Sequence, residues 1–180
     1  MPPLKYEDIT NIISNFTQLQ SIKSFYESGT YYGSTSIEMQ PHFNQIITVE
    51  VSVNLYKNYH QKLSAFPNIS HINGASEDIL YDVLNINHNE FIFFLDGHYS
   101  SGDTGSSNIE VPLLEELNCI NKLYKKNGLI IIDDFNLFET TSAEDWSNIT
   151  INNVIKCFTN NQINSYFILN NRMIIVIDNQ

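Results

Sequence analysis

Three aspartates follow two apolar runs of the sequence. Asp96 ends the run Phe91–Asp96, and Asp133 and Asp134 stand where the run Leu129–Asp133 ends. If the two runs are neighbouring parallel strands, their carboxyl ends share one edge of a sheet and the three carboxylates meet. A divalent cation would relieve their repulsion, and ligation by oxygen alone suits Mg²⁺, Mn²⁺ or Ca²⁺ rather than zinc. We predict a metal site here; the alternative is that Asp133 caps the next turn and Asp134 faces water.

His98 is a candidate general base. It stands two residues after Asp96, at the start of the Gly/Ser-rich loop Gly97–Asn108. The unperturbed pKa of histidine, about 6.5, suits a proton acceptor at neutral pH. The sequence therefore predicts that His98 is catalytic in its neutral form. The remaining histidines stand where surface or packing roles are typical: His42, His60, His71 and His88.

Glycines mark the end of the first apolar run, in the stretch Glu27-Ser28-Gly29-Thr30-Tyr31-Tyr32-Gly33. Glycine lets a backbone approach a ligand closely, and Gly33 is placed to open the next helix. The stretch is not G-x-G-x-x-G, because Tyr31 takes the place of the second glycine. The chain also lacks a G-x-x-x-x-G-K-[ST] phosphate loop. By itself the stretch predicts either a ligand-binding loop or a plain strand–helix turn.

Polar residues also follow the second and third apolar runs. Glu50 ends the run Ile46–Glu50, where a carboxylate can accept hydrogen bonds from two ribose hydroxyls. The alternative for Glu50 is a solvated carboxylate at a strand end. Ser76 follows the run Ile69–Ile72 and is predicted to cap the next helix.

The elements that would position these residues alternate along the chain. Apolar runs indicate strands at residues 24–27, 46–50, 69–72, 91–96 and 129–133. Helical spacing indicates helices at about residues 8–22, 53–63, 76–84 and 112–123. This alternation is typical of βαβ units and of a parallel sheet covered on both faces. Right-handed crossovers then place the carboxyl ends of the strands along one edge, where ligands of open α/β sheets bind.

The end of the chain breaks this alternation. Residues 166–169 and 173–177 are apolar runs separated by Asn170-Asn171-Arg172. Asparagine tolerates positive φ, so the sequence predicts a tight antiparallel hairpin rather than another crossover. A parallel sheet that finishes in such a hairpin is not the usual arrangement of a nicotinamide-dinucleotide enzyme.

Taken together, these motifs resemble those of the class I S-adenosylmethionine-dependent methyltransferases. The stretches are E-S-G-T-Y-Y-G, V-E at the second strand, L-D-G-H-Y-S and I-I-I-D-D-F, and the resemblance covers about residues 23–178. Asp96 with the Asp133–Asp134 pair is similar to the metal-dependent O-methyltransferases, which include catechol O-methyltransferase and, more closely, the macrocin-type enzymes that methylate sugar hydroxyls. The resemblance implies a Rossmann-like α/β fold with a seven-stranded, mostly parallel sheet, a C-terminal antiparallel hairpin and helices on both faces.

The resemblance also implies roles for single residues. S-adenosyl-L-methionine would be the cofactor, and a divalent cation, Mg²⁺ or Mn²⁺, would be held by Asp96, Asp133 and Asp134. His98 fills the place of the second aspartate in the D-G-D motif of the sugar-modifying branch, which is thought to supply the base. Glu27 and Gly29 would line the methionine moiety, Glu50 would hold the ribose and Ser76 would lie near the adenine. The full set of cofactor contacts would be Glu27, Gly29, Thr30, Gly33, Glu50, Ser76 and Asp96.

Composition bounds the organisation and the compartment. We expect one domain over residues 1–180, with an N-terminal helix at 1–22 and a Rossmann-like core at 23–180. The chain has 20 acidic and 9 basic residues and a formal charge of −11, which argues against a nucleic-acid partner. It shows no signal peptide or membrane span, and Cys119 and Cys157 are expected to be free thiols. These observations predict a cytoplasmic protein without a membrane partner.

The expected partner is a small-molecule acceptor, which the resemblance identifies as a carbohydrate. The acceptor would be recognised by the opening helix, the loop 97–108 and the segment 136–146. Tyr99 and Trp146 are candidates to stack on a sugar ring, with simple packing as the alternative. A homodimer, or a module of a larger protein, is the expected assembly.

Three other functions stay open at this stage. The first is a methyltransferase that needs no metal, with His98 as the base and the aspartates in structural roles. The second is a catalytically silent module of the same fold that acts as a partner or scaffold. A nicotinamide-dependent oxidoreductase is the least favoured, because the glycine fingerprint is missing and the chain ends in a hairpin.

Overall fold

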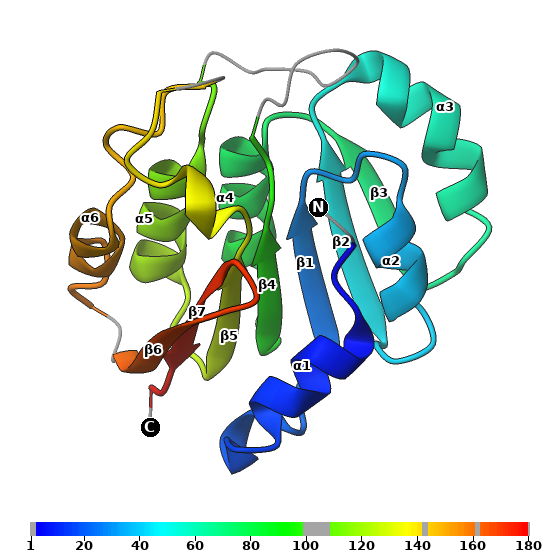
Figure 1. The fold of residues 1–180 in the computed structure, drawn as a ribbon. Coiled ribbons are helices and arrows are strands. Elements are labelled where there is room, and N and C mark those ends of the chain that lie inside the picture. The colour runs from blue at the N-terminus through cyan, green and yellow to red at the C-terminus, as the bar shows by residue number, and fades with distance from the viewer. Residues whose placement is uncertain (1–2, 99–108, 142–143, 161–162, 180) are drawn as a thin grey trace.

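A seven-stranded sheet forms the centre of the computed structural model, which describes residues 3–98, 109–141, 144–160 and 163–179 (Figure 1). The strand order is β3-β2-β1-β4-β5-β7-β6. The first five strands run parallel, whereas β7 is antiparallel to both β5 and β6. The strands are β1 (Ser24–Ser28), β2 (Gln45–Glu50), β3 (Ile69–Asn73), β4 (Phe91–Leu95), β5 (Gly128–Ile132), β6 (Ile163–Leu169) and β7 (Arg172–Ile177).

Helices cover both faces of this sheet. One face packs against α1 (Tyr6–Ile13), α2 (Ser34–Met39) and α3 (Val53–Leu63). The opposite face packs against α4 (Ser76–Ile86), α5 (Leu113–Leu123) and α6 (Ile151–Lys156). The architecture is therefore the predicted Rossmann-like three-layer arrangement with a terminal antiparallel hairpin.

An apolar core lies on each face of the sheet, which explains why the central strands are continuous apolar runs in the sequence. Successive side chains of a strand point to opposite faces. In β4, Phe91, Phe93 and Leu95 pack into the core with α4 and α5, whereas Ile92 and Phe94 pack into the core with α1. Every residue of β4 and β5 is buried. A strand with polar residues on alternate positions would leave one of these layers without a partner.

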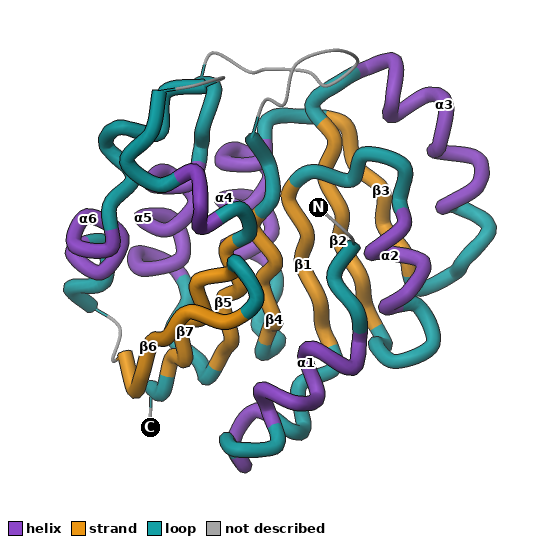
Figure 2. Tube along the Cα trace, in the orientation of Figure 1, coloured by secondary structure: helices purple, strands orange, loops and turns teal. Residues whose placement is uncertain are grey.

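The carboxyl ends of the parallel strands share one edge, which lies at the top of Figure 1. Figure 2 shows the N-terminal segment leading from α1 toward this edge, beside β1. The hairpin that closes the sheet turns through Asn170 and Asn171, whose φ values are +50° and +61°. Two residues with positive φ are what the tightest hairpin turns require, and asparagine accepts them.

The opening helix is shorter than the sequence predicts. α1 ends at Ile13, and a separate 3₁₀ turn follows at Thr17–Leu19, in place of one helix over residues 8–22. The reason is local: the side chains of Ser14 and Asn15 both donate hydrogen bonds to the carbonyl oxygen of Asn11. Such bonds compete with the backbone bonds that would continue the helix.

Two further features of the described chain bear on the expectations. Cys119 and Cys157 are free thiols, as expected. No helix among the described residues is long and apolar enough to cross a membrane.

His71 should make the fold sensitive to acid. It lies on the edge strand β3, it is buried, and its ring contacts the rings of Tyr56 and His60. Burial, followed by the charge of His60, lowers the pKa of His71 from 6.5 to about 4. Because the unfolded chain binds the proton first, stability is present above pH 6.5 and falls as the pH drops toward 4. The maximal slope is about 1.4 kcal/mol per pH unit.

His71→Phe keeps a ring in this place and removes the titration. Urea unfolding at pH 7 and pH 5 should show a smaller loss of stability for His71→Phe than for the parent chain. His88→Phe, on an exposed turn, is the control and should leave the loss unchanged. Equal losses in the parent chain and in His71→Phe would contradict the prediction.

Candidate active site

The loop after β1 is pressed against the end of β4. Gly29 has φ +81°, and a Cβ built on it would lie 2.3 Å from the carbonyl oxygen of Asp96. The backbone N–H groups of Gly29 and Thr30 both donate to the carbonyl of Val49 at 3.0 Å. Any residue larger than glycine would separate this loop from the aspartate. The glycine therefore brings the loop and the edge carboxylate into one site.

Tyr31 takes the backbone conformation of the glycine that it replaces. Its φ is +50°, in the left-handed region that bulky residues rarely adopt. Its N–H donates to Glu50 Oε2 at 2.8 Å, and its ring stacks on that of Tyr32 with the ring centroids 3.8 Å apart. Both rings remain more than 40% exposed. Backbone strain of this kind collects at functional sites, and here it presents two aromatic faces to solvent.

Glu27 lies at the base of the loop and is buried. Its Oε2 accepts hydrogen bonds from Ser36 Oγ at 2.5 Å and from Thr48 Oγ1 at 2.7 Å. Burial raises the pKa of Glu27 to about 7, against the opposing effect of these two hydroxyls. The carboxyl is thus held in one orientation with its charge only partly compensated.

Glu50 is buried too, which excludes the solvated carboxylate considered from sequence. Oε1 accepts from the N–H of Ser52 at 2.9 Å, and Oε2 accepts from that of Tyr31. Burial raises its pKa, and the two backbone donors oppose the rise. The predicted ribose-binding residue therefore also fixes the loop that carries Tyr31.

Ser76 does not cap α4 as predicted. Ala75 is the residue before the helix, it provides no side-chain cap, and Ser76 is the first helical residue. The hydroxyls of Ser76 and Ser28 instead hydrogen-bond Glu116, a buried carboxyl of α5. Gly97 packs between them, since a Cβ there would lie 2.9 Å from Ser28 Cβ. Glu116 was not identified as a site residue from the sequence, although its position among the apolar residues of α5 indicates a buried carboxyl group.

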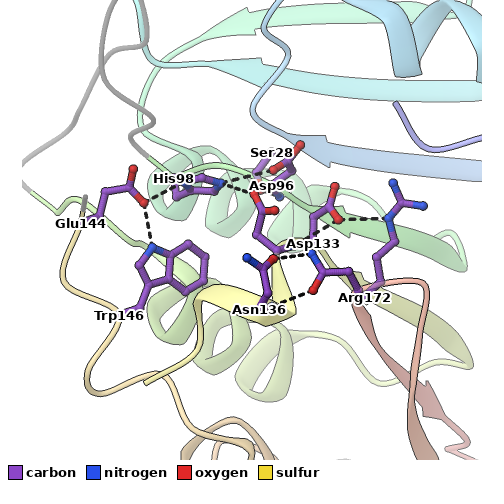
Figure 3. Close-up of polar contacts among 10 residues, drawn as sticks. Ser28, Asp96, His98, Asp133, Asn136, Glu144, Trp146 and Arg172 are labelled. Carbon is purple, nitrogen blue, oxygen red and sulfur yellow. Dashed lines mark hydrogen bonds and ion pairs between the residues drawn. The ribbon is translucent and has the colours of Figure 1, made fainter. Parts of the chain in front are cut away.

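A histidine joins the aspartates at the carboxyl edge. His98 Nε2 lies 3.0 Å from Asp134 Oδ2 and 3.6 Å from Asp96 Oδ1, and Nδ1 lies 3.1 Å from Glu144 Oε2 (Figure 3). One donor atom from each of Asp96, His98 and Asp134 lies within 4.8 Å of the others. The structure thus gathers a group with two carboxylate oxygens and one imidazole nitrogen.

Asp133 is engaged elsewhere, which differs from the predicted set of three aspartate ligands. Its Oδ1 lies 3.1 Å from Nε of Arg172, the first residue of β7, and both side chains are buried (Figure 3). The guanidinium also reaches Asp8 of α1 at 3.5 Å. Asp133 lies beside the histidine-containing group but outside it.

That group fits a divalent cation by its chemistry. Carboxylates suit Mg²⁺, Ca²⁺ and Mn²⁺, whereas an imidazole nitrogen is accepted by transition metals. This group offers mixed nitrogen and oxygen donors, whereas the ligand set predicted from sequence, Asp96, Asp133 and Asp134, offers oxygen alone and stays a prediction. Mn²⁺ is the ion of the predicted set that such mixed donors suit best.

The carboxylates around His98 favour its protonated form as long as no metal ion is bound, whereas the sequence predicted a neutral base. Burial by itself would lower its pKa, but the hydrogen bonds that His98 donates to Asp134 and Asp96 and the charges of Asp96 and Glu144 raise it to about 10. The expectation of a neutral base used the unperturbed pKa of histidine, because these three carboxylate partners could not be identified from the sequence.

One pocket of about 200 Å³ joins the glycine loop to the carboxyl edge. Its described lining has four carboxyl groups and two tyrosines, and no basic side chain. Of the predicted site residues, Gly33, Glu50, Ser76 and His98 do not line it. The lining residues are Pro3, Glu27, Gly29, Thr30, Tyr31, Tyr32, Ser34, Thr35, Asp96, Asp133 and Asp134.

Comparison with known proteins finds likeness in structure alone. Neither protein-family models nor curated protein sequences give a match. A Staphylococcus aureus protein assigned as a caffeoyl-CoA O-methyltransferase superposes with a TM-score of 0.61 at 12% identity, over 98% of this chain and 85% of that one. Aeropyrum pernix fibrillarin with natively bound S-adenosyl-L-methionine gives 0.57 at 12% identity, over 89% and 68%.

A third similar structure performs another reaction. Thermotoga maritima spermidine synthase gives a TM-score of 0.56 at 13% identity, and the match covers 88% of this chain but only 54% of the synthase. Identities this low establish an architecture and leave the chemistry to the residues of the site. The chain has the Rossmann-like fold of the class I methyltransferases.

Proposed function

We propose that this chain is an S-adenosylmethionine-dependent O-methyltransferase that acts on a hydroxyl of a small molecule, with carbohydrate as the acceptor class and a divalent cation as an aid. One observation carries the proposal. A single pocket joins the strained glycine loop after β1 to the carboxylates after β4 and β5. Ligands of open α/β sheets bind at this edge.

The charge of the pocket supports a cationic cofactor. S-adenosylmethionine carries a sulfonium and an ammonium group, and four carboxyl groups line the pocket: Glu27, Asp96, Asp133 and Asp134. The fibrillarin structure of the same fold contains this cofactor. A dinucleotide, by contrast, would bring its phosphate charges against the same carboxylates, and the described lining offers no basic side chain to receive them.

Methyl transfer to oxygen asks mainly for positioning. The carbon–sulfur bond breaks as the carbon–oxygen bond forms in line with it, and the acceptor loses its hydroxyl proton. Glu27, fixed by Ser36 and Thr48, would hold the cofactor, while the edge carboxylates would orient the acceptor and take up the proton. A divalent cation, when bound at the histidine-containing group, would polarise the acceptor hydroxyl.

The exposed tyrosines are suited to a sugar ring. Tyr31 and Tyr32 line the pocket and are partly exposed, and the C–H face of a sugar packs well on an aromatic ring such as the outer face of Tyr31. Trp146, considered for this role from sequence, is buried and donates its indole N–H to Glu144 at 2.7 Å. Tyr99 lies outside the described residues.

A second candidate is the same transfer without a metal. It is favoured by the two cationic groups of the edge, since Arg172 neutralises Asp133 and His98 lies between Asp96 and Asp134. With a pKa of about 10, His98 would serve there as a hydrogen-bond donor rather than as the base.

Glu27 should be essential for cofactor binding. Glu27→Gln keeps the shape of the side chain and removes the charge that would attract the ammonium group, which S-adenosylhomocysteine shares with the cofactor. A lost charge-assisted hydrogen bond corresponds to about 1.5–3 kcal/mol, so the Kd for S-adenosylhomocysteine should rise by about tenfold or more. Isothermal titration calorimetry measures this directly, and NAD should give no binding.

Glu38→Gln is the matched control. Glu38 lies on α2 and pairs with Lys5 at 3.5 Å, outside the pocket lining. Its replacement should leave the Kd unchanged. Unaltered affinity in a folded Glu27→Gln chain would remove Glu27 from the cofactor site, and absence of binding by the parent chain would end the proposal.

The proposed packing of the acceptor on the Tyr31 ring can be tested by measuring methyl transfer from labelled S-adenosylmethionine, with Mn²⁺ present, to a panel of neutral and amino sugars. Tyr31→Ala should raise the acceptor KM by about tenfold and leave the Kd for S-adenosylhomocysteine within about twofold, because about 1–2 kcal/mol of ring stacking is lost. Tyr81→Ala is the control, since Tyr81 is equally exposed but lies on α4. An unchanged acceptor KM in Tyr31→Ala would argue against packing of the acceptor on this ring.

A further inference from the structure

We propose that His98, in place of Asp133, completes a divalent-metal site with Asp96 and Asp134, and that Glu144 is the positioning residue that aims His98 at the ion. The inference deepens the proposed function and rests on it for the purpose of the ion. Its evidence, however, is the arrangement of four side chains from three segments of the chain.

The donor atoms are close enough together to share one ion. Two ligands at right angles with bonds of about 2.1 Å lie about 3.0 Å apart, and two on opposite sides lie about 4.2 Å apart. His98 Nε2 is 3.0 Å from Asp134 Oδ2 and 3.6 Å from Asp96 Oδ1. All three donors lie within 4.8 Å of one another.

Glu144 fixes which nitrogen of His98 faces the aspartates. Its Oε2 lies 3.1 Å from His98 Nδ1 and accepts the indole N–H of Trp146 at 2.7 Å (Figure 3). The Trp146 ring also stands edge-on to the imidazole, with the ring centroids 5.0 Å apart. Because Nδ1–H donates a hydrogen bond to this carboxylate, Nε2 is the nitrogen that faces Asp96 and Asp134, and it would release its proton when the ion binds. Metal-binding histidines characteristically donate their second N–H to a carboxylate in this way.

Burial makes this support rigid. Glu144 and Trp146 are 6% and 3% exposed, and Oε2 of Glu144 contacts both the imidazole of His98 and the indole of Trp146. A carboxylate so placed costs desolvation free energy that its two donors have to offset. We infer that its place behind His98 serves the orientation of that ring.

Asp133 is less available as a metal ligand than Asp96 and Asp134, because one of its oxygens is held by a cationic side chain. Its Oδ1 is held by Arg172 Nε at 3.1 Å, and the guanidinium in turn lies 5.8 Å from the ring centre of Phe94 and 3.5 Å from Asp8 Oδ2. A cation drawn to Asp133 would meet the charge of Arg172 nearby. The ion is therefore expected on the His98 side of the carboxyl edge.

The test is Mn²⁺ binding to the full chain, without cofactor or acceptor. Titration followed by the electron paramagnetic resonance signal of free Mn²⁺ should show one site. Pulsed measurements on the bound ion should show coupling to a directly coordinated ¹⁴N nucleus. Bound Mn²⁺ without nitrogen coupling would overturn the assignment of His98 as a ligand. This measurement uses the parent chain and therefore does not depend on the folding of a variant.

Variants then separate the ligand from its positioning residue. His98→Ala should abolish the nitrogen coupling and weaken Mn²⁺ binding by about tenfold or more. Glu144→Ala should weaken binding by about 10–100-fold, as is typical when an outer carboxylate is lost, and should alter the coupling. Glu144→Gln should recover part of both, because its amide oxygen still accepts from Nδ1–H. Full affinity and unchanged coupling in Glu144→Ala would remove Glu144 from the proposal.

Two controls distinguish failure of the metal-site inference from failure of the proposed function. Glu139→Gln, at an exposed position of the same segment, should leave Mn²⁺ binding unchanged. S-adenosylhomocysteine binding is measured separately on each chain. Cofactor binding without a Mn²⁺ site would refute the inference and leave the metal-independent methyltransferase. A nitrogen-coordinated Mn²⁺ without cofactor binding would sustain the inference and refute the proposed function.

Discussion

Neutralisation of the aspartates at the carboxyl edge of the sheet is the constraint on which the site depends. Asp96, Asp133 and Asp134 follow the adjacent strands β4 and β5. In the described part of the chain, the cationic groups in contact with them are His98 and Arg172. Charges withdrawn from water each cost several kcal/mol, which only a well-placed partner offsets. The fold therefore has to place one cationic side chain beside Asp133 and another beside Asp96 and Asp134.

The sheet topology supplies the cation for Asp133. β7 runs antiparallel to β5 with Met173 opposite Ile132, so Arg172 falls beside the residue that follows β5. A further parallel strand would have placed its first residue at the other edge of the sheet. The same guanidinium reaches Asp8 of α1, and the segment before α1 brings Pro3 to the pocket. The terminal hairpin and the opening helix are thus joined through the buried Arg172 side chain, which contacts both Asp133 and Asp8.

The fold was predictable because its signals are local and periodic. Continuous apolar runs marked strands buried on both faces, and Asn170-Asn171 marked the hairpin turn. The strand-end residues could be named for the same reason, since an acid that follows a strand must lie at its carboxyl end. The partners of these acids could not be named. Glu144 meets His98 across 46 residues and Arg172 meets Asp133 across 39, and no periodicity records such contacts between loops. The expectation of a neutral base at His98 could not take those partners into account.

The crowding of carboxyl groups also determines what the pocket can bind. Burial raises the pKa of Glu27 from 4.5 to about 7 and that of Asp96 from 3.8 to about 6. Because both values are raised in the folded chain, the stability that these groups contribute is complete below their unfolded pKa values and is lost as the pH rises through 6 and 7. A ligand that brings positive charge favours the ionised carboxylates and offsets that loss, whereas a phosphate would increase it. The preference for a cationic ligand therefore arises from the combined charge of the carboxyl groups that line the pocket. No single sequence motif predicts this combined charge.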